Sequence, residues 1–343
     1  MNYNRGEKIF RRIGMEKLKE IYSGVVLSFI IAIIATILGK KFPIIGGAVF
    51  GILIGIIINN TIGKPERSKK GVAFVSKKVL QWSIILLGAG LSFTQVKSTG
   101  IESLSVTMVT ITVAFLSAYL VGKLLKVPSN LKSLIGVGTA ICGGSAIAAV
   151  SPIIEADDME IAYSISTIFF FNIIAVLIFP PLGHALNLTD KGFGLWAGTA
   201  INDTSSVVAA GYIFSNAAGE FATIVKLTRA TLIIPVSLVF AIVTAYKKKR
   251  ESKFNLKDIF PWFILWFLVA SILNTLGVFP KNSIPYIEST GKFMIVMALS
   301  AVGLSANFKD MLKSGLKPLL LGLIVWFNVA VSSLLVQHFM GQL

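Results

Sequence analysis

Long apolar runs, separated by short polar or basic segments, organise the whole chain. A helix needs about 20 apolar residues to cross the hydrocarbon core of a bilayer, and it pairs its own backbone polar groups there. The runs therefore predict an all-α integral membrane protein with about ten or eleven transmembrane helices. The predicted spans cover residues 22–39, 43–60, 79–96, 103–122, 133–153, 161–181, 193–214, 221–245, 259–278, 291–308 and 318–338.

Composition and charge agree with lipid as the solvent of this chain. Hydrophobic residues make up 55% of the 343 positions and charged residues only 14%, whereas soluble domains carry about 25% charged residues. The net charge of +16 comes from basic residues that fall between the apolar runs, so it indicates membrane topology rather than a nucleic-acid partner. We expect one multi-pass domain over 1–343 in the cytoplasmic membrane, with 1–21 as a basic cytoplasmic segment.

The basic residues also predict an orientation. With a cytoplasmic N-terminus and alternating spans, 25 of the 32 basic residues fall on the cytoplasmic side, where positive loops are retained. This bias favours eleven spans and an external C-terminus, and it places the acidic turn 155–160 outside. One re-entrant segment would change the parity, which leaves ten spans as the alternative.

Two pairs of segments resemble each other and indicate internal repeats. The tetrad Gly-Thr-Ala-Ile occurs at 138–141 and again at 198–201, and a weaker pair centres on Gly90-Leu-Ser and Gly303-Leu-Ser. Transporters built from inverted repeats bind substrate near the midplane, between the repeats. The alternative is close helix packing through small residues. The tetrads run in the same direction in the predicted topology, so they fit an inverted repeat only if one segment is re-entrant.

The small-residue tract at 138–145 is the first candidate site. Adjacent glycines weaken a helix, and a break there would leave free N–H groups at the start of a half-helix, where an anion binds favourably. Tight helix packing is again the alternative. The candidate residues are Gly138, Thr139, Cys142, Gly143, Gly144 and Ser145.

Three charged residues inside the spans complete the candidate site. Asp203 lies near mid-bilayer beside Asn202, Ser205 and Ser206, where a carboxylate is costly unless it is paired, hydrated or protonated. Lys226 and Arg229 share one face of a later helix. They would bind an anion or neutralise Asp203, unless they extend to the interface or Asp203 only holds helices together.

Two single asparagines, Asn172 and Asn328, are predicted to make hydrogen bonds between helices and are left outside the site.

These same segments resemble the YeiH-like membrane proteins, an uncharacterised family often labelled sulfate exporters. The resemblance rests on 138–149 followed by Ser-Pro-Ile-Ile, on 196–211, and on 226–235. It implies a multi-pass permease, with an interrupted-helix design like that of cation/proton antiporters and bile-acid-type transporters. Many relatives carry His at the position of Asn202 and Gln at that of Ser206, and this departure puts proton coupling through position 202 in doubt.

The sequence favours a secondary transporter of a small anion, with membrane lipid and a small solute or ion as its partners. A cation/proton antiporter built around Asp203 is the alternative, and a membrane enzyme or receptor is the alternative of another class. No phosphate-binding loop, zinc motif or nucleophile–base pattern is present, so we expect no enzymatic activity, cofactor or metal. A homo-oligomer is left open, and the sequence identifies no substrate.

Overall fold

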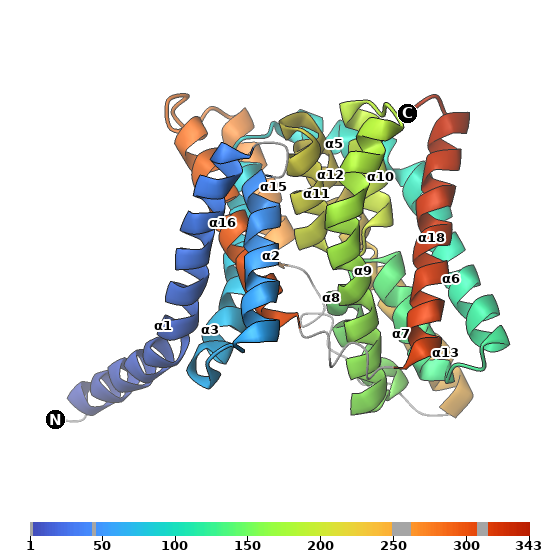
Figure 1. Ribbon diagram of the computed structural model, residues 1–343, viewed down its shortest axis with the longest axis horizontal. Helices are drawn as coiled ribbons and strands as arrows, with labels where there is room; N and C mark the ends of the chain where they lie inside the picture. The colour runs from blue at the N-terminus through green and yellow to red at the C-terminus, as the bar shows by residue number, and fades with distance from the viewer. Residues whose placement is uncertain (1–2, 43–45, 249–261, 307–314) are drawn as a thin grey trace. The chain divides into compact units, whose positions relative to one another are not determined.

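The computed structural model describes residues 3–42, 46–248, 262–306 and 315–343 (Figure 1). Every regular element in these residues is helical, and seven of the helices are long and apolar enough to cross a membrane. The predicted all-α membrane class is therefore confirmed. The chain divides into two compact units, which comprise 1–90 with 280–307, and 91–279 with 308–343.

The first unit is built from long helices that pack through small residues. Its elements are α1 (Tyr3–Lys41), α2 (Gly46–Thr61), η1 (Glu66–Ser68), α3 (Lys69–Phe74), the π-helical turn η2 (Val75–Val79), α4 (Leu80–Gly88) and α16 (Ile284–Ser305). A Cβ atom at Gly303 would lie only 2.3 Å from the carbonyl oxygen of Ile52, so glycine permits the close approach of α16 to α2. The span predicted over 79–96 is wrong in its bounds, because the helical segment runs from Glu66 to Gly88.

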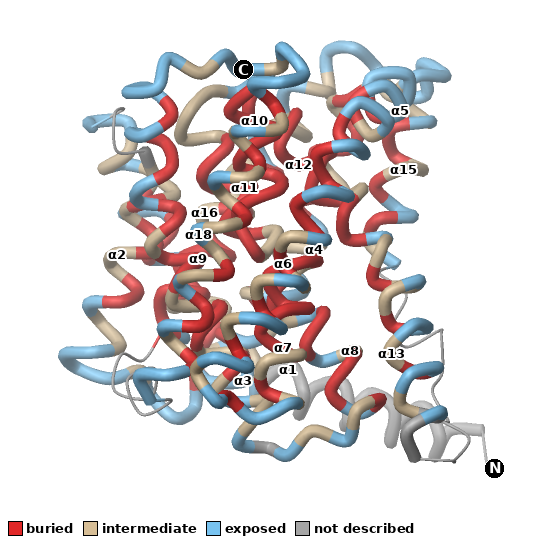
Figure 2. Tube along the Cα trace, turned by 90° about the vertical axis from the view of Figure 1, so that its right-hand side faces the viewer, coloured by how far each residue is buried: buried red, intermediate tan, exposed pale blue. Residues whose placement is uncertain are grey.

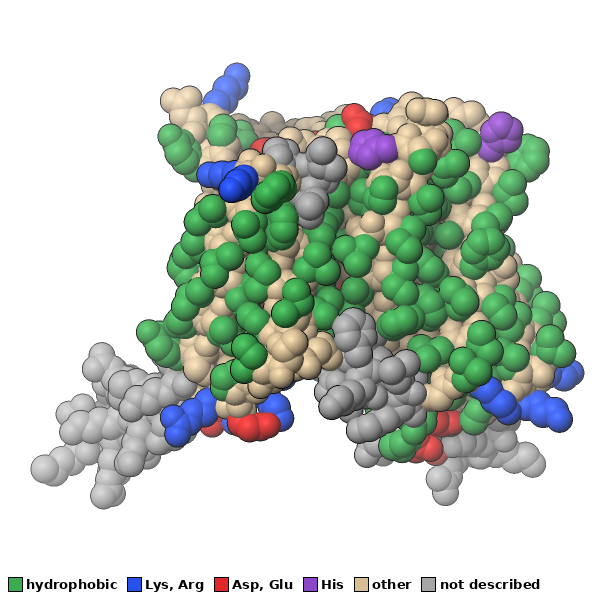
Figure 3. All heavy atoms as spheres, in the orientation of Figure 1, with side chains coloured by type: hydrophobic (Ala, Val, Ile, Leu, Met, Phe, Trp, Pro, Cys, Tyr) green, Lys and Arg blue, Asp and Glu red, His purple; other side chains and the backbone are tan. Residues whose placement is uncertain are grey.

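The second unit holds every residue of the candidate site. Its elements are α5 (Phe93–Glu102), α6 (Leu104–Leu124), α7 (Ser129–Ala140), α8 (Gly144–Ile154), α9 (Asp158–Ala185), α10 (Asp190–Ala200), α11 (Thr204–Phe214), α12 (Asn216–Thr231), α13 (Ile233–Lys248), α15 (Trp262–Thr275) and α18 (Leu316–Phe339). Buried residues concentrate in α10, α11 and α12 (Figure 2). Apolar side chains cover the middle of the helices on the face in Figure 3, as a lipid-facing surface requires.

Helices α7 and α8 form a hairpin, called hairpin 1 below, whose two ends lie on the same side. At these ends the Asn130 side-chain amide donates a hydrogen bond to the Glu160 carboxylate at 3.2 Å. Between the arms, a Cβ atom at Gly138 would lie 3.0 Å from the Ile147 side chain. The chain therefore enters through α7, turns at 141–143, and returns through α8.

Helices α10 and α11 form a second hairpin, hairpin 2, with the same design. Its ends are joined by the Ser215 hydroxyl, which donates to the Asp190 carboxylate at 2.6 Å. The rings of Phe193 and Phe214, one on each arm, stack with their centroids 4.0 Å apart. Hairpin 2 therefore also enters and leaves on one side.

The two hairpins enter from opposite ends of α9. Hairpin 1 precedes the start of this 28-residue helix and hairpin 2 follows its end. Arms of 11 or 12 residues extend about 16–18 Å, which is roughly half of the hydrocarbon thickness. The tips can therefore meet near the middle, and the space beside Gly143 shows that they do, because a Cβ atom there would lie 3.1 Å from the Cβ of Asp203.

This arrangement corrects the predicted topology. The segments 133–153 and 193–214 were predicted to cross the membrane, but each returns to the side from which it entered. The turn 155–160 consequently lies on the same side as the start of α7, opposite to its predicted place. Removing two crossings leaves the parity of eleven spans unchanged, and Lys191 is the basic residue that changes sides among those the structure describes. The segments 249–261 and 307–314, which hold further basic residues, lie outside the described residues.

Candidate functional site

Both hairpin tips are irregular because their sequences stop a helix. Gly143 has φ +69°, a left-handed conformation that glycine adopts without strain, and it separates α7 from α8. In hairpin 2, Ile201 and Asp203 are extended. The last turn of each first arm is left with carbonyl groups that have no partner within the helix, and buried groups of this kind need another donor.

Lys226 supplies one such donor from α12. Its side chain is fully buried, and its Nζ atom donates to the carbonyl oxygen of Ile141 at 2.8 Å and to that of Ile201 at 2.9 Å. These two residues occupy equivalent positions in the two hairpins. A single ammonium group therefore joins tip to tip.

Arg229, one turn further along α12, makes the same connection with more bonds. Its side chain is also fully buried. Nε donates to the Ala140 carbonyl at 2.6 Å, Nη2 to the Thr139 carbonyl at 3.3 Å, and Nη1 to the Thr199 carbonyl. The Thr110 hydroxyl on α6 accepts a further bond from Nη1 at 3.0 Å.

The repeated tetrad thus has a structural role. Gly-Thr-Ala-Ile forms the end of the first arm in both hairpins, and the carbonyl groups of both copies accept from Lys226 and Arg229. The copies enter from opposite sides, so they behave as inverted repeats. Both basic side chains also lie against the negative ends of two helix dipoles.

The second arms differ in how their first amides are capped. Asp203 is the N-cap of α11, where its carboxylate accepts from the Ser206 amide at 3.0 Å and from the Ser205 hydroxyl. Gly143 is the N-cap of α8 and has no side chain to accept from that helix. The start of α8 therefore keeps amide donors and a positive dipole end beside Asp203.

The predicted site residues fall into a sealed group and a more accessible group. Gly138, Thr139, Gly143, Asn202, Ser205, Ser206, Lys226 and Arg229 are buried, whereas Cys142, Gly144 and Asp203 are half-buried and Ser145 is exposed. Within the described residues no ion pair joins Asp203 to Lys226 or Arg229. The two cations are held by carbonyl groups and do not extend to an interface.

The sequence did not reveal the roles of Thr110 and Asn172, which lie near the tips. It did predict the role of Asn328. Thr110, a bonding partner of Arg229, carries no local signal. Asn172 was predicted to bond between helices, but neither atom of its amide finds a hydrogen-bond partner in the part of the chain that the structure describes. The same prediction is confirmed for Asn328, whose side-chain amide donates to the Ser117 hydroxyl at 3.0 Å.

Comparison with known proteins places the chain in a family. The family described as Conserved hypothetical protein 698 matches residues 23–322. The chain belongs to this family. A protein of Clostridium tetani named UPF0324 membrane protein is 46% identical over 95% of this chain and 99% of its own length.

A Fusobacterium nucleatum protein with the same family name is 44% identical over 93% of this chain and 98% of its own length. A third UPF0324 membrane protein, from Streptococcus mutans, is 45% identical over 93% of this chain and 97% of its own length. The resemblance to YeiH-like proteins is thereby confirmed, and the shared name describes a membrane protein without stating an activity.

Proposed function

We propose that this protein is a secondary transporter of a small anion, with its binding site at the junction of the two hairpin tips. The observation that carries the proposal is the meeting of two basic side chains and one acidic side chain at this junction. In their ionised forms Lys226 and Arg229 contribute two positive charges and Asp203 contributes one negative charge. Two helix N-termini and two C-termini meet there, and their partial charges of about one half each cancel. One positive charge is left over, and a bound anion would neutralise it.

The cations set the field at this site without being the direct ligands of the anion. Their donors are largely committed to carbonyl groups of the tips. The free amides at the start of α8 are the donors best placed to contact an anion. Because Asp203 lies beside them, its negative charge opposes anion binding, and its protonation would favour it. Anion and proton would then be bound together.

The same geometry disfavours the alternative of a cation/proton antiporter. A bare cation in a broken-helix site needs carbonyl oxygens as ligands, and at these tips the carbonyl groups of Ile141, Ile201 and Ala140 already accept from side-chain cations. We propose no enzymatic activity.

Alternating access would come from motion of one compact unit relative to the other. Both hairpins, α9 and α12 belong to the unit 91–279 with 308–343, so the whole site would travel together. We place the protein in the cytoplasmic membrane with its N-terminus inside, on the charge bias of its loops. The suggestion of sulfate as the substrate rests only on the label of the family that the sequence resembles. Sulfate is one candidate among small inorganic and organic anions.

Counterflow in proteoliposomes tests this function. The purified chain should exchange labelled sulfate, sulfite or a small carboxylate, and exchange should rise as the pH falls. With labelled sulfate, which stays fully deprotonated near neutral pH, Asp203→Asn should abolish the pH dependence. Asp190→Asn, which makes the same change at the far end of hairpin 2, should retain it. Anion exchange whose pH dependence survives in Asp203→Asn would refute the coupling role, and flux that needs a cation but no anion would support the antiporter.

A further inference from the structure

Two buried amide side chains near the tips have no hydrogen-bond partner among the described residues. Asn202, in the tip of hairpin 2, is 1% exposed, and Asn172, on α9, is 2% exposed. Among the described residues, neither the oxygen nor the nitrogen of either amide finds a hydrogen-bond partner. Leaving buried polar atoms unpaired is costly, so a pair of such side chains at one place indicates a ligand.

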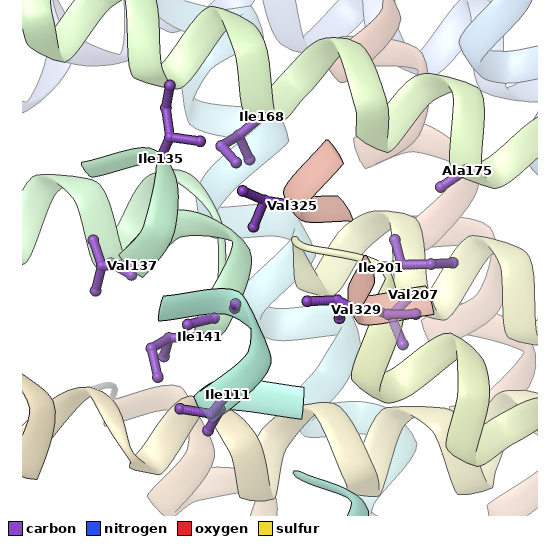
Figure 4. Close-up of a cluster of buried hydrophobic side chains, with 14 of the residues drawn as sticks. Ile111, Ile135, Val137, Ile141, Ile168, Ala175, Ile201, Val207, Val325 and Val329 are labelled. Atoms are coloured by element: carbon purple, nitrogen blue, oxygen red, sulfur yellow. The ribbon is translucent and has the colours of Figure 1, made fainter. Parts of the chain in front are cut away.

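The helical spacing of α9 places Asn172 at the junction of the tips. Ile168, one turn before it, lies beside the tip of hairpin 1, with its Cγ2 atom 3.4 Å from a Cβ built on Gly143. Ala175, one turn after it, belongs to the same buried cluster as Ile201 and Val207 of hairpin 2 (Figure 4). Residues 168, 172 and 175 share one helical face, so Asn172 lies on the face of α9 that packs beside the tip of hairpin 1.

The chemistry of these groups restricts what they can bind. Each primary amide offers N–H donors and one carbonyl acceptor. A fully deprotonated oxyanion such as sulfate has acceptors only, so it would leave both amide carbonyl groups unpaired. A small oxyanion that keeps at least one proton can accept from the amide N–H groups and from the start of α8, and can donate its own O–H to an amide carbonyl.

We propose that Asn172 and Asn202 form a subsite for a small oxyanion in its protonated form, such as hydrogensulfite or dihydrogenphosphate, in preference to sulfate. This inference rests on the proposed anion transport and names its substrate class. A site built to bond a ligand's hydroxyl group rejects an analogue that lacks it, because the site's own polar groups are then left unpaired.

Competition in the counterflow assay tests the preference. At one pH near neutrality, unlabelled sulfite or phosphate should inhibit uptake of labelled sulfite at least about tenfold more strongly than sulfate does. Asn172→Leu and Asn202→Leu, which keep the approximate shape and remove both polar atoms, should each lower uptake at least about tenfold. Asn328→Leu is the matched control, because its amide already bonds Ser117, and its uptake per folded molecule should be unchanged.

Thermal unfolding of the same variants separates binding from folding. Asn172→Leu and Asn202→Leu should unfold at or above the wild-type temperature without ligand, since they remove unpaired groups. Asn328→Leu should unfold at a lower temperature, since the Ser117 hydroxyl loses its partner. Destabilisation by the first two changes would mean that these side chains are structural, and would overturn the subsite.

The outcomes also distinguish the two proposals. If the wild-type protein moves no anion, anion transport fails and the subsite fails with it. If it moves anions but prefers sulfate, or if both Leu variants transport normally, the subsite alone fails.

Discussion

Hairpins 1 and 2 have a shared half, which is the first arm, and a divergent half, which is the second arm. Their first arms end in the same tetrad, and both tetrads present carbonyl groups to Lys226 and Arg229. Their second arms begin with Gly143 in one case and Asp203 in the other. The shared half holds the tips together, whereas the divergent half begins with a glycine that has no capping side chain in one hairpin and with a carboxylate in the other.

Replacing Arg229 should weaken the contact between the two first arms more than any other single substitution. Arg229→Leu would leave the carbonyl groups of Ala140, Thr139 and Thr199 without their donor in a buried region. We expect a loss of at least about 3 kcal/mol in the free energy of unfolding, measured by denaturation in detergent. Arg67→Ala, at an exposed position, is the control and should change stability by about 0.5 kcal/mol or less. A stable Arg229→Leu protein would show that the tips do not depend on this residue.

Replacing Lys226 should also destabilise the protein, but by less than replacing Arg229. Lys226→Met keeps most of the apolar stem but removes two charge-assisted bonds, to Ile141 and Ile201. The expected loss is about 2–3 kcal/mol, because both carbonyl groups become unpaired. The variant also removes the excess positive charge, so anion exchange should fall even in protein that remains folded. Unchanged exchange would contradict the charge argument.

The glycine at the tip of hairpin 1 can be compared with its neighbour. Gly143→Ala should destabilise the protein by about 1–2 kcal/mol, because its φ of +69° disfavours any other residue and a Cβ atom would press on Asp203. Gly144→Ala should be tolerated, since its new Cβ would lie 3.6 Å from Phe169, an ordinary contact. Equal effects of the two changes would show that the sharp turn at 143 is not required.

Changes at Asp203 should have the smallest effect on stability and the clearest effect on coupling. Asp203→Ala loses the N-cap of α11 and should cost about 1 kcal/mol. Asp203→Asn retains a good cap and should cost only a few tenths of a kcal/mol. With sulfate as the labelled substrate, both variants should lose the pH dependence of transport, so the comparison separates capping from protonation in one assay.

The sequence predicted the residues at the tips better than it predicted how the chain reaches them. The paired glycines, the repeated tetrad and the deep Asp203 pointed to broken helices, and both breaks occur where these residues lie. The topology failed because two apolar arms of 11 residues have the length and hydropathy of one membrane span. Hydropathy records composition and carries no information about a reversal of direction.

Long-range partners were equally invisible in the sequence. Lys226 and Arg229 were recognised as unusual, but the spacing on one helix does not reveal that their partners are backbone carbonyl groups 25 to 90 positions away. Asn172 is a single asparagine in a largely apolar helix, with no local pattern to separate it from Asn328. Only the packing of α9 against both tips distinguishes the two.

Side-specific labelling tests the opposed hairpins most directly. In a Cys142→Ser background, which removes the single cysteine, cysteines would be placed at exposed hairpin ends as Ser129→Cys, Met159→Cys, Lys191→Cys and Ala217→Cys. We expect Ser129→Cys and Met159→Cys to react with an impermeant maleimide from one side of the membrane, and Lys191→Cys and Ala217→Cys from the other. Labelling of the two ends of one hairpin from opposite sides would show that it crosses the membrane, and would contradict the site built on its tip.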